Sequence, residues 1–273
     1  MRRAFTLITL LMIAANVQAL TVMSINTEWF WDEEKPHEGT QPFGPKGKPP
    51  STKQVELKAL ALAQIINQNK ADIVGLAEVE GRAVVKRIIP YLDGEWNIAF
   101  RQGRDSKTGQ DVALITKLDL IAGTVTNFPD AKGVYKGRQA RPTKVLGVGL
   151  RQNGQKYFVV MTHFISKHDK NDKKRSAQAN AVARAVVKQA RSYDHMIVMG
   201  DMNDTPNSVT LRQIRSAGLT LISGEDDYSY VYKGKKELID HVLVSKSLAE
   251  GASFKSVDLG PISDHHAVVA TLK

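Results

Sequence analysis

Apolar residues along this chain follow two spacings, one typical of buried strands and one typical of helices. Short apolar runs predict strands at residues 20–26, 72–79, 97–101, 112–116, 120–128, 144–150, 157–163, 195–200, 238–244 and 267–272. Apolar residues at helical spacing, or runs rich in helix-forming residues, predict helices at 52–69, 83–91, 173–191 and 208–216. Ser51 or Thr52 can cap the helix at 52–69.

The order of these elements favours one architecture. Helices come first, several strands follow in a row, and helix and strand then alternate, whereas a doubly wound parallel sheet would alternate more steadily. We therefore predict an α/β fold in which two packed mixed β-sheets are flanked by helices, a four-layer sandwich. Residues 32–51 hold several Pro, Gly and Lys residues without a hydrophobic period and predict a long surface loop. With no linker in between, residues 20–273 are expected to form one domain.

The N-terminal segment has the pattern of a secretory signal peptide. Arg2 and Arg3 precede an apolar run that is shorter than the roughly 20 residues of a membrane-spanning helix. Val17 and Ala19 then place small residues at the two positions that a signal peptidase reads. We expect residues 1–19 to be cleaved after Ala19, with an uncleaved membrane anchor as the alternative. The expected location is secreted, either periplasmic or extracellular, without stable membrane association.

Composition narrows the possible chemistry. The chain has no cysteine, which excludes thiol catalysis and thiolate metal sites. Its formal net charge is +10, to which Arg2 and Arg3 contribute two charges. A basic surface captures polyanions such as nucleic acids, although solubility is the simpler explanation. The sequence contains no His-Glu-x-x-His spacing, which argues against a zinc site. It also contains no Gly-x-Ser-x-Gly elbow, which argues against a serine nucleophile.

Polar side chains suited to hydrolysis follow or end several predicted strands. Rigid strands can aim such side chains into a common cleft. Each has an ordinary structural alternative, such as a solvated Glu78, a turn at Asn26 or an Asx turn at Asp201. Their joint occurrence favours a shared site. The set comprises Asn26, Glu78, His163, Asp201, Asn203, Asp240, Asp264 and His265.

In their order along the chain, these residues resemble the endonuclease/exonuclease/phosphatase superfamily, which is deoxyribonuclease I-like. The resemblance covers residues 21–272. Its most specific parts are the run Gly-Asp-Met-Asn-Asp at 200–204 and Ser-Asp-His at 263–265, with Ile-Asp-His-Val at 239–242 as a further match. His-Phe-Ile-Ser-Lys at 163–167 resembles a motif of the secreted bacterial branch. The resemblance implies a four-layer α/β sandwich, a divalent cation and attack of water on a phosphate ester.

The cation is expected to be Mg²⁺, with Mn²⁺ or Ca²⁺ as alternatives. Mg²⁺ prefers a sparse set of oxygen ligands and keeps several waters. Glu78 can supply a carboxylate, and Asn26 is a neutral ligand or a supporting residue beside it. Asp264 is either a further ligand or a residue that positions His163.

The remaining residues suit the chemical step. Asp240 and His265 are expected to pair, so that His265 serves as a general base or as a cation against the phosphate. His163 is expected to donate to a phosphate oxygen or to the leaving group. Asp201 can orient the attacking water, and Asn203 can donate its amide to the developing oxyanion.

Outer positions are weaker candidates. Asp111 can buttress His163, and Arg104 and Arg141 can contact phosphate, although each also suits a solvated surface. The aromatic stretch 28–32 can stack on bases, but packing beneath the long loop is favoured. The helix at 173–191 forms either a basic rim or a solvated face. Its basic residues are Lys173, Lys174, Arg175, Arg184, Lys188 and Arg191.

The sequence therefore predicts a secreted, metal-dependent phosphodiesterase, with a nuclease acting on DNA or RNA as the first hypothesis. We expect it to act as a monomer on a nucleic-acid substrate. Hydrolysis of a phospholipid such as sphingomyelin, or of a small phosphate ester, is the second hypothesis. A non-catalytic binding module of the same fold is the third. A lipid-cleaving enzyme would need an exposed apolar hairpin, and the sequence shows no such segment apart from Trp29–Trp31.

Overall fold

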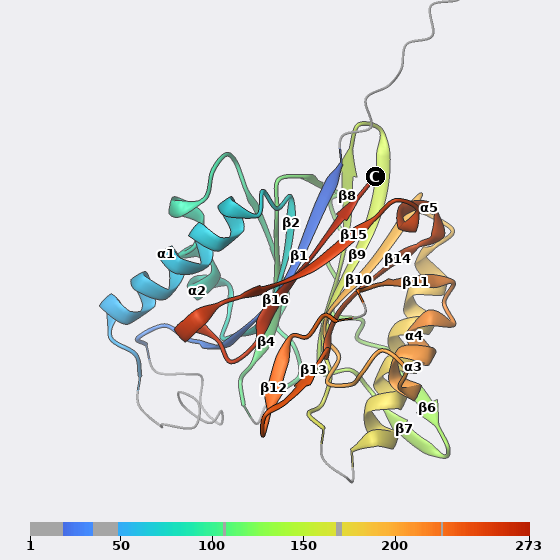
Figure 1. Cartoon of the computed structure of the whole chain (residues 1–273). Coiled ribbons are helices and arrows are strands. Elements are labelled where there is room, and N and C mark those ends of the chain that lie inside the picture. Colours follow the sequence, from blue (N-terminus) through green and yellow to red (C-terminus); the bar gives the residue numbers. More distant parts are fainter. Residues whose placement is uncertain (1–18, 35–48, 106–107, 168–170, 225) are drawn as a thin grey trace, which may run out of the picture.

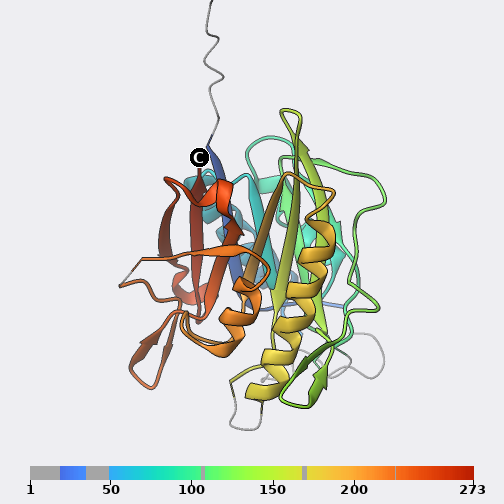
Figure 2. The same ribbon diagram turned by 90° about the vertical axis from the view of Figure 1, so that its right-hand side faces the viewer.

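Two six-stranded mixed sheets stack face to face in the computed structural model, with helices on both outer faces (Figures 1 and 2). The structure describes residues 19–34, 49–105, 108–167, 171–224 and 226–273. The first sheet runs β15 (Ser253–Asp258), β16 (His266–Leu272), β1 (Leu20–Phe30), β2 (Ile73–Val79), β4 (Asp111–Thr116), β3 (Asn97–Phe100). The second runs β11 (Leu219–Ile222), β14 (Asp240–Ser245), β10 (His195–Asp201), β9 (Gln155–His163), β8 (Lys144–Gln152), β5 (Asp119–Leu120). The predicted four-layer α/β sandwich is confirmed.

The central strands read as continuous apolar runs because both faces of each sheet are covered. In β4, Val112 and Leu114 enter the core between the sheets, whereas Ala113 and Ile115 pack against the outer helices. Successive side chains of a strand point to opposite faces, so a strand buried on both sides needs apolar residues throughout. Packing on both faces therefore holds the central strands in place.

Two groups of helices cover the sheets. The first sheet is covered by α1 (Thr52–Gln68), α2 (Arg82–Lys86) and the 3-10 helix η2 (Ile89–Tyr91). The second is covered by α3 (Asp172–Gln189) and α4 (Val209–Arg215), while α5 (Lys246–Ala249) and η3 (Gly260–Ile262) are short connections. Ser51 caps α1 in a capping box with Gln54, as expected for this start.

Some predicted elements were wrong in type or extent. The predicted helix at 83–91 splits into α2 and η2, because Pro90 lacks a backbone N–H and disfavours helix at the residue before it. The predicted strand at 120–128 forms a regular strand only in β5. The chain then forms a loop that contacts β8 through a bridge between Thr126 and Gly147 and through hydrogen bonds of Ile121 and Thr124 with Gly149. Arg175 does not belong to a basic rim, because its side chain is buried.

Several short hairpins and edge strands carry no strong pattern in the sequence. They are the hairpin of β6 (Gly133–Tyr135) and β7 (Arg138–Ala140), the hairpin of β12 (Tyr230–Tyr232) and β13 (Lys235–Glu237), and the edge strands β11 and β15. Their residues are largely half-buried or exposed, so apolar periodicity does not mark them.

Strand direction brings the ends of several strands to one edge of the sandwich. β1 and β2 are parallel to each other, as are β9 and β10. β14 is antiparallel to β10 and β16 is antiparallel to β1, so both begin where their neighbours end. This edge lies at the bottom of Figure 1, where the β12–β13 hairpin projects. Glu78, His163, Asp201, Asp240 and His265 lie at or next to the ends of five of these strands, and Asn26 lies inside the longer β1 at its bulge.

The predicted signal peptide lies almost entirely outside the described residues, which begin at residue 19. Within the described part of the chain, no helix combines the length and apolar character needed to cross a membrane.

Candidate active site

The side chain of Asn26 lies at the centre of a buried polar cluster between the two sheets. Its Nδ2 atom donates to Glu78 Oε1 at 3.2 Å and to Asp201 Oδ2 at 3.1 Å. The same atom lies 3.5 Å from His265 Nε2. β1 and β2 of the first sheet therefore meet β10 of the second sheet in one site, as the sequence predicts.

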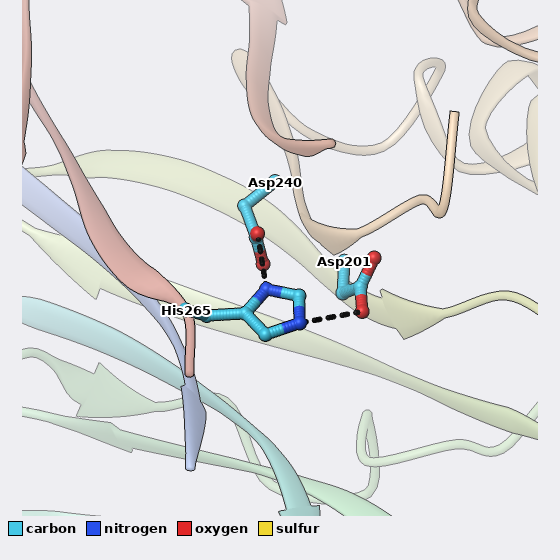
Figure 3. A group of neighbouring side chains, drawn as sticks. All are labelled: Asp201, Asp240 and His265. Carbon is cyan, nitrogen blue, oxygen red and sulfur yellow. Dashed lines mark hydrogen bonds and ion pairs between the residues drawn. The ribbon is translucent and has the colours of Figure 1, made fainter. Parts of the chain in front are cut away.

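His265 and Asp240 form the predicted carboxylate–imidazole pair. Asp240 Oδ2 lies 2.8 Å from His265 Nδ1, and the opposite ring nitrogen lies 4.0 Å from Asp201 Oδ2 (Figure 3). Ser229 Oγ accepts a hydrogen bond from the Asp240 backbone N–H at 3.0 Å, which fixes the start of β14. The ring of Tyr230 stacks on His265 with the centroids 4.7 Å apart. The imidazole is thus held by its carboxylate partner and by an aromatic face.

The pKa values within this pair follow from burial and charge. Burial alone would lower the pKa of His265, but the Asp240 carboxylate outweighs it and, together with Asp201, raises the pKa to about 10. Burial is the main cause, and repulsion from Asp240 the second, that raises the pKa of Asp201 to about 7. Near neutral pH the ring of His265 is therefore a cation that donates from both nitrogens, and Asp201 is poised to exchange a proton.

His163 ends β9 on the other side of Asp201. Its Nε2 atom lies 3.5 Å from Asp201 Oδ2 and 3.9 Å from Glu78 Oε1. Burial, reinforced by the nearby Lys144 ammonium, lowers the pKa of His163 well below its ordinary value. The ring is therefore neutral. Its other nitrogen, Nδ1, is buried with no hydrogen-bond partner among the described residues.

The expected support of His163 by Asp111 is not made. Asp111 instead accepts hydrogen bonds from the Gly103 N–H at 2.7 Å and from Gln102 Nε2 at 2.5 Å. Its buried carboxylate holds the loop that leaves β3, because Asp111 begins β4 and faces that loop rather than the end of β9. Burial raises the pKa of Asp111 to about 7.

A strained bulge aims Glu78 into the cluster. Its φ is +60°, and Glu28 and Trp29 on the neighbouring strand have φ of +46° and +57°. The β1–β2 register shifts at this point. Trp29 donates its backbone N–H to Glu78 Oε2 at 3.2 Å, and Glu28 donates its own to Asn26 Oδ1 at 3.0 Å. A bulge re-aims a side chain out of the regular alternation, and strain of this kind is retained where a site needs it.

The turn after β10 presents Asp201 and needs glycine before it. Gly200 has a φ of +138°, and an added Cβ would press on the carbonyl of Thr162. Asp201 Oδ1 accepts the Asn203 N–H at 2.8 Å, so the predicted Asx turn exists while the second carboxylate oxygen faces the site. Asn203 donates its amide to the Phe164 carbonyl at 3.0 Å, which leaves one N–H for a substrate oxygen.

Sequence reasoning missed two cations beside the cluster. Lys144 lies opposite His163 in the β8–β9 ladder, and its buried Nζ donates to Gln110 Oε1 at 3.0 Å. Lys58 extends from α1 and donates to the Glu28 carbonyl at 2.8 Å, which ties the helix to the strained bulge. Only the strand register and the docking of α1 reveal them, because neither lies in a sequence motif.

The other sequence candidates lie farther out. Asp264 is half-exposed and places Oδ1 4.0 Å from His265 Nε2. Arg104 is exposed and donates to the Pro129 carbonyl at 2.7 Å. The side chain of Arg141 is exposed as well, and its carbonyl accepts from Gln178. The printed contacts of both arginines lie outside the cluster. Trp31 is buried with Trp29 stacked on it at 4.9 Å, which supports packing rather than an exposed aromatic stretch.

The donor set fits a hard divalent cation. Glu78 and Asp201 are buried carboxylates that share the Asn26 amide. Burial raises the pKa of Glu78 in spite of the nearby Lys144 and His265, so a bound divalent cation would favour its charged form. Ligand atoms of Asp201, Asp240 and His265 also lie within 4.8 Å of one another. The Asp240–His265 hydrogen bond already uses that histidine's Nδ1, which favours Glu78 as the anchor. The Asn26 amide would have to turn for Oδ1 to bind a cation, because Nδ2 now faces the acids.

Residues 23–265 match the model of the Endonuclease/Exonuclease/phosphatase family, and the chain belongs to this family. Its members are metal-dependent phosphoester hydrolases, and this chain is an enzyme of that class. The cluster of acidic and histidine side chains agrees with this assignment. No curated protein sequence matches the chain.

Solved structures of low sequence identity share the fold. An endonuclease/exonuclease/phosphatase family protein from Leptotrichia buccalis is 14% identical, with a TM-score of 0.65 over 93% of this chain and 100% of that chain. The human nocturnin catalytic domain with bound sulfate is 15% identical, with a TM-score of 0.62 over 93% and 97%. A mutant of Staphylococcus aureus beta toxin with bound magnesium ions is 15% identical, with a TM-score of 0.63 over 94% and 100%.

Proposed function

We propose that this enzyme is an exported nuclease that hydrolyses phosphodiester bonds of DNA or RNA by attack of water, with Mg²⁺ as its cation. One observation carries the proposal. The charged His265–Asp240 pair, the neutral His163 and the carboxylates of Asp201 and Glu78 lie in one cluster, whose neighbouring side-chain atoms are 2.8 to 4.0 Å apart. Phosphodiester hydrolysis needs an activated water, charge neutralisation and a donor to oxygen, and this cluster contains a group for each.

In the proposed mechanism, Asp201 accepts a proton, and His265 and His163 donate hydrogen bonds to the phosphate ester. Asp201, with its pKa raised to about 7, accepts the proton of the attacking water. The His265 cation donates from Nε2 to a phosphate oxygen, while Asp240 holds the ring through Nδ1. Neutral His163 donates a hydrogen bond from Nε2 to the phosphate or the leaving oxygen. The one free N–H of Asn203 is available to the developing oxyanion.

The metal would be held by Glu78, with Asp264 and a reoriented Asn26 as further ligands. A bound divalent cation neutralises phosphate charge and orients the ester. Magnesium ions bound in the Staphylococcus aureus beta toxin structure, which shares the fold, support the choice of Mg²⁺.

The charge of the whole chain favours a polyanionic substrate. The formal net charge is +10, or +8 without Arg2 and Arg3 of the proposed signal peptide, yet the catalytic cluster is acidic, so most of the excess of lysine and arginine lies elsewhere on the molecule. Such a distribution attracts a long phosphate backbone more than it attracts a small ester.

A phospholipid is the second candidate substrate, and one observation favours it. Val231 and Tyr232 are exposed on β12, next to Tyr230, which stacks on His265. An apolar hairpin beside a phosphodiesterase site suits a lipid surface. Two exposed side chains make a small patch, and Lys233, Lys235 and Lys236 on the same hairpin also suit a phosphate backbone.

The deciding experiment offers the purified enzyme plasmid DNA, RNA and sphingomyelin vesicles, each with Mg²⁺ and with EDTA. We expect cleavage of nucleic acid with Mg²⁺ and none with EDTA. Cleavage of vesicles alone would replace the nuclease by the lipid hydrolase. Asp201→Ala is the matched inactive control, because it removes the proposed base and leaves the basic surface intact.

Export and oligomeric state complete the proposal. We propose that residues 1–19 direct export and that the enzyme works as a monomer. Cell fractionation of the full chain and of a chain without residues 2–19 tests the first point. Analytical ultracentrifugation of the exported protein tests the second.

A further inference from the structure

A groove of about 980 Å³ lies on the outer face of the second sheet, between α3 and the loop at 121–132. This loop runs alongside α3 before it enters the β6–β7 hairpin (Figure 2). We call it the α3 groove. It takes no part in the catalytic cluster described above, and its chemistry differs from that of the acidic site.

Aromatic rings form the floor of the α3 groove. Phe158 packs on Tyr193 at 4.9 Å and on Phe128 at 6.2 Å between ring centroids. Glycines on β8 make room for them, because a Cβ at Gly147 would press on Phe128 and one at Gly149 would lie 2.5 Å from the Tyr193 hydroxyl. Phe128 and Tyr193 remain half-buried, so part of each ring stays open to a ligand.

The backbone at Phe128 is strained in a way that sets this floor. Its φ is +48°, a left-handed conformation that a bulky aromatic residue rarely adopts. The Phe128 N–H donates to Thr126 Oγ1 at 3.0 Å, and its carbonyl accepts from Ala131 at 3.0 Å, so the turn is locked on both sides. Strain held in place by its surroundings often marks a functional surface.

The rim of the α3 groove is cationic. Exposed Lys132, Arg184 and Lys188 line it, and Asp130 is the one acidic residue among its described lining residues. Ala181 and Ala185 form the helix wall and leave space beside the rings. Half-exposed aromatic rings under a basic rim are complementary to a base that carries a phosphate.

We propose that the α3 groove binds one nucleotide of the nucleic-acid strand, with its base on Phe128 and Tyr193 and its phosphate at Arg184 and Lys188. The identity of the ligand rests on the proposed nuclease function. The groove would hold the strand while another of its phosphodiester bonds occupies the catalytic cluster.

The distance between the two sites sets a length requirement for the substrate. Phe158 and His163 lie on the same strand, five residues apart, or about 17 Å at the rise of about 3.3 Å per residue. Phe158 points to the outer face of the sheet and His163 to the site between the sheets, so the bound strand must also pass around the sheet edge. A stacked strand advances about 3.4 Å per nucleotide, so at least about five nucleotides are needed to reach both sites. A dinucleotide can use the catalytic cluster but not the groove at the same time.

The test compares Arg184→Gln/Lys188→Gln with the control Lys86→Gln/Lys255→Gln, which removes the same charge at exposed positions of α2 and β15. For a 12-nucleotide single strand we expect about a fivefold higher KM in the groove variant, an unchanged kcat and an unaffected control. For a dinucleotide, all three proteins should have the same kinetic constants. An equal KM of the groove variant and the control on the long strand would overturn the proposal.

A direct binding measurement can test the α3 groove independently of the proposed nuclease activity. Fluorescence anisotropy with a labelled 12-nucleotide strand in EDTA measures affinity on the His265→Ala background without cleavage. Loss of the one phosphate contact should lower the slope of log K against log salt by about 0.7. Absence of cleavage by the wild type with this slope change intact would reject the nuclease and keep the groove. Cleavage without the slope change, or equal binding of an abasic strand, would reject the groove and keep the nuclease.

Discussion

Asp240 controls the charge of His265 from a position that no solvent reaches. It is fully buried, and its carboxylate raises the pKa of His265 to about 10 against the effect of burial. Asp240→Asn keeps the shape and removes the charge, so the pKa of His265 should fall and the ring should lose its proton near neutral pH. We expect turnover to fall about a thousandfold at pH 7. An NMR titration of the His265 ring in EDTA checks the cause, and a ring still protonated at pH 9 would contradict it.

The same pair makes stability depend on pH. The folded-state pKa of His265 is raised, so its contribution is complete below the unfolded pKa of about 6.5 and is lost as pH rises towards about 10. Urea unfolding in EDTA should show the stability advantage of the wild type over Asp240→Asn shrinking between pH 6.5 and 10. An advantage that stays constant over this range would show that the raised pKa is not due to Asp240.

Gly200 combines a positive φ with a close approach of the Thr162 carbonyl, whereas Gly154 has a positive φ alone. Alanine at each position therefore measures the two effects separately. Both Gly200 and Gly154 have positive φ, of +138° and +79°, but only an alanine at Gly200 would press on another residue, the carbonyl of Thr162. Gly154→Ala should lower the free energy of unfolding by about 1 kcal/mol through backbone strain alone. Gly200→Ala should cost about 3 kcal/mol, because β9 and β10 must also separate. Equal losses in urea titrations would mean that the close approach of the two strands is not important.

At the scale of single elements, α3 is fastened to the catalytic turn by a buried arginine. Arg175 Nε lies 3.2 Å from Asp204 Oδ2, and Asp204 also accepts from Thr210 in α4 at 2.7 Å. Arg175→Met leaves this carboxylate buried without its charged partner, so the free energy of unfolding should fall by about 3 kcal/mol. Lys173→Met, on the exposed face of the same helix, is the matched control and should change it by less than about 0.5 kcal/mol. Similar unfolding midpoints for the two variants would show that the buried pair adds no net stability.

Central elements were predictable from the sequence, and peripheral ones were not. β4 and β10 show as unbroken apolar runs because they are buried on both faces, whereas the edge strand β15 alternates exposed and half-buried residues. The residues at 121–128 mix apolar and polar side chains in a way that also suits a strand. In the structure they form a loop, and Phe128 packs against Gly147 of β8.

The same division holds for the catalytic cluster. Asp201 ends a buried strand, His265 precedes one and Asn26 precedes the bulge of β1, so their convergence followed from strand direction once a common edge was assumed. Lys144 and Lys58 reach the site through the register of one ladder and the docking of one helix. These are tertiary facts that no local motif encodes.

On the scale of the whole molecule, opposite charges serve two separate steps. The catalytic cluster is acidic and suits a divalent cation, while the chain as a whole carries a formal net charge of +10. Capture of a long strand should therefore depend on salt, because bound phosphates release counterions, whereas hydrolysis of an ester held at the cluster should not. Four phosphate contacts on a single strand predict about a 50-fold rise in KM between about 50 and about 200 mM salt.

This separation can be measured on one enzyme with two substrates. A small phosphodiester such as bis-p-nitrophenyl phosphate engages only the catalytic cluster, so its KM should change less than about twofold over the same salt range. The kcat values of both substrates should stay constant, because the cation and the buried pair are shielded from bulk ions. Equal salt dependence for the two substrates would mean that the basic surface does not capture the strand, and the case for a polymeric substrate would then rest on the family alone.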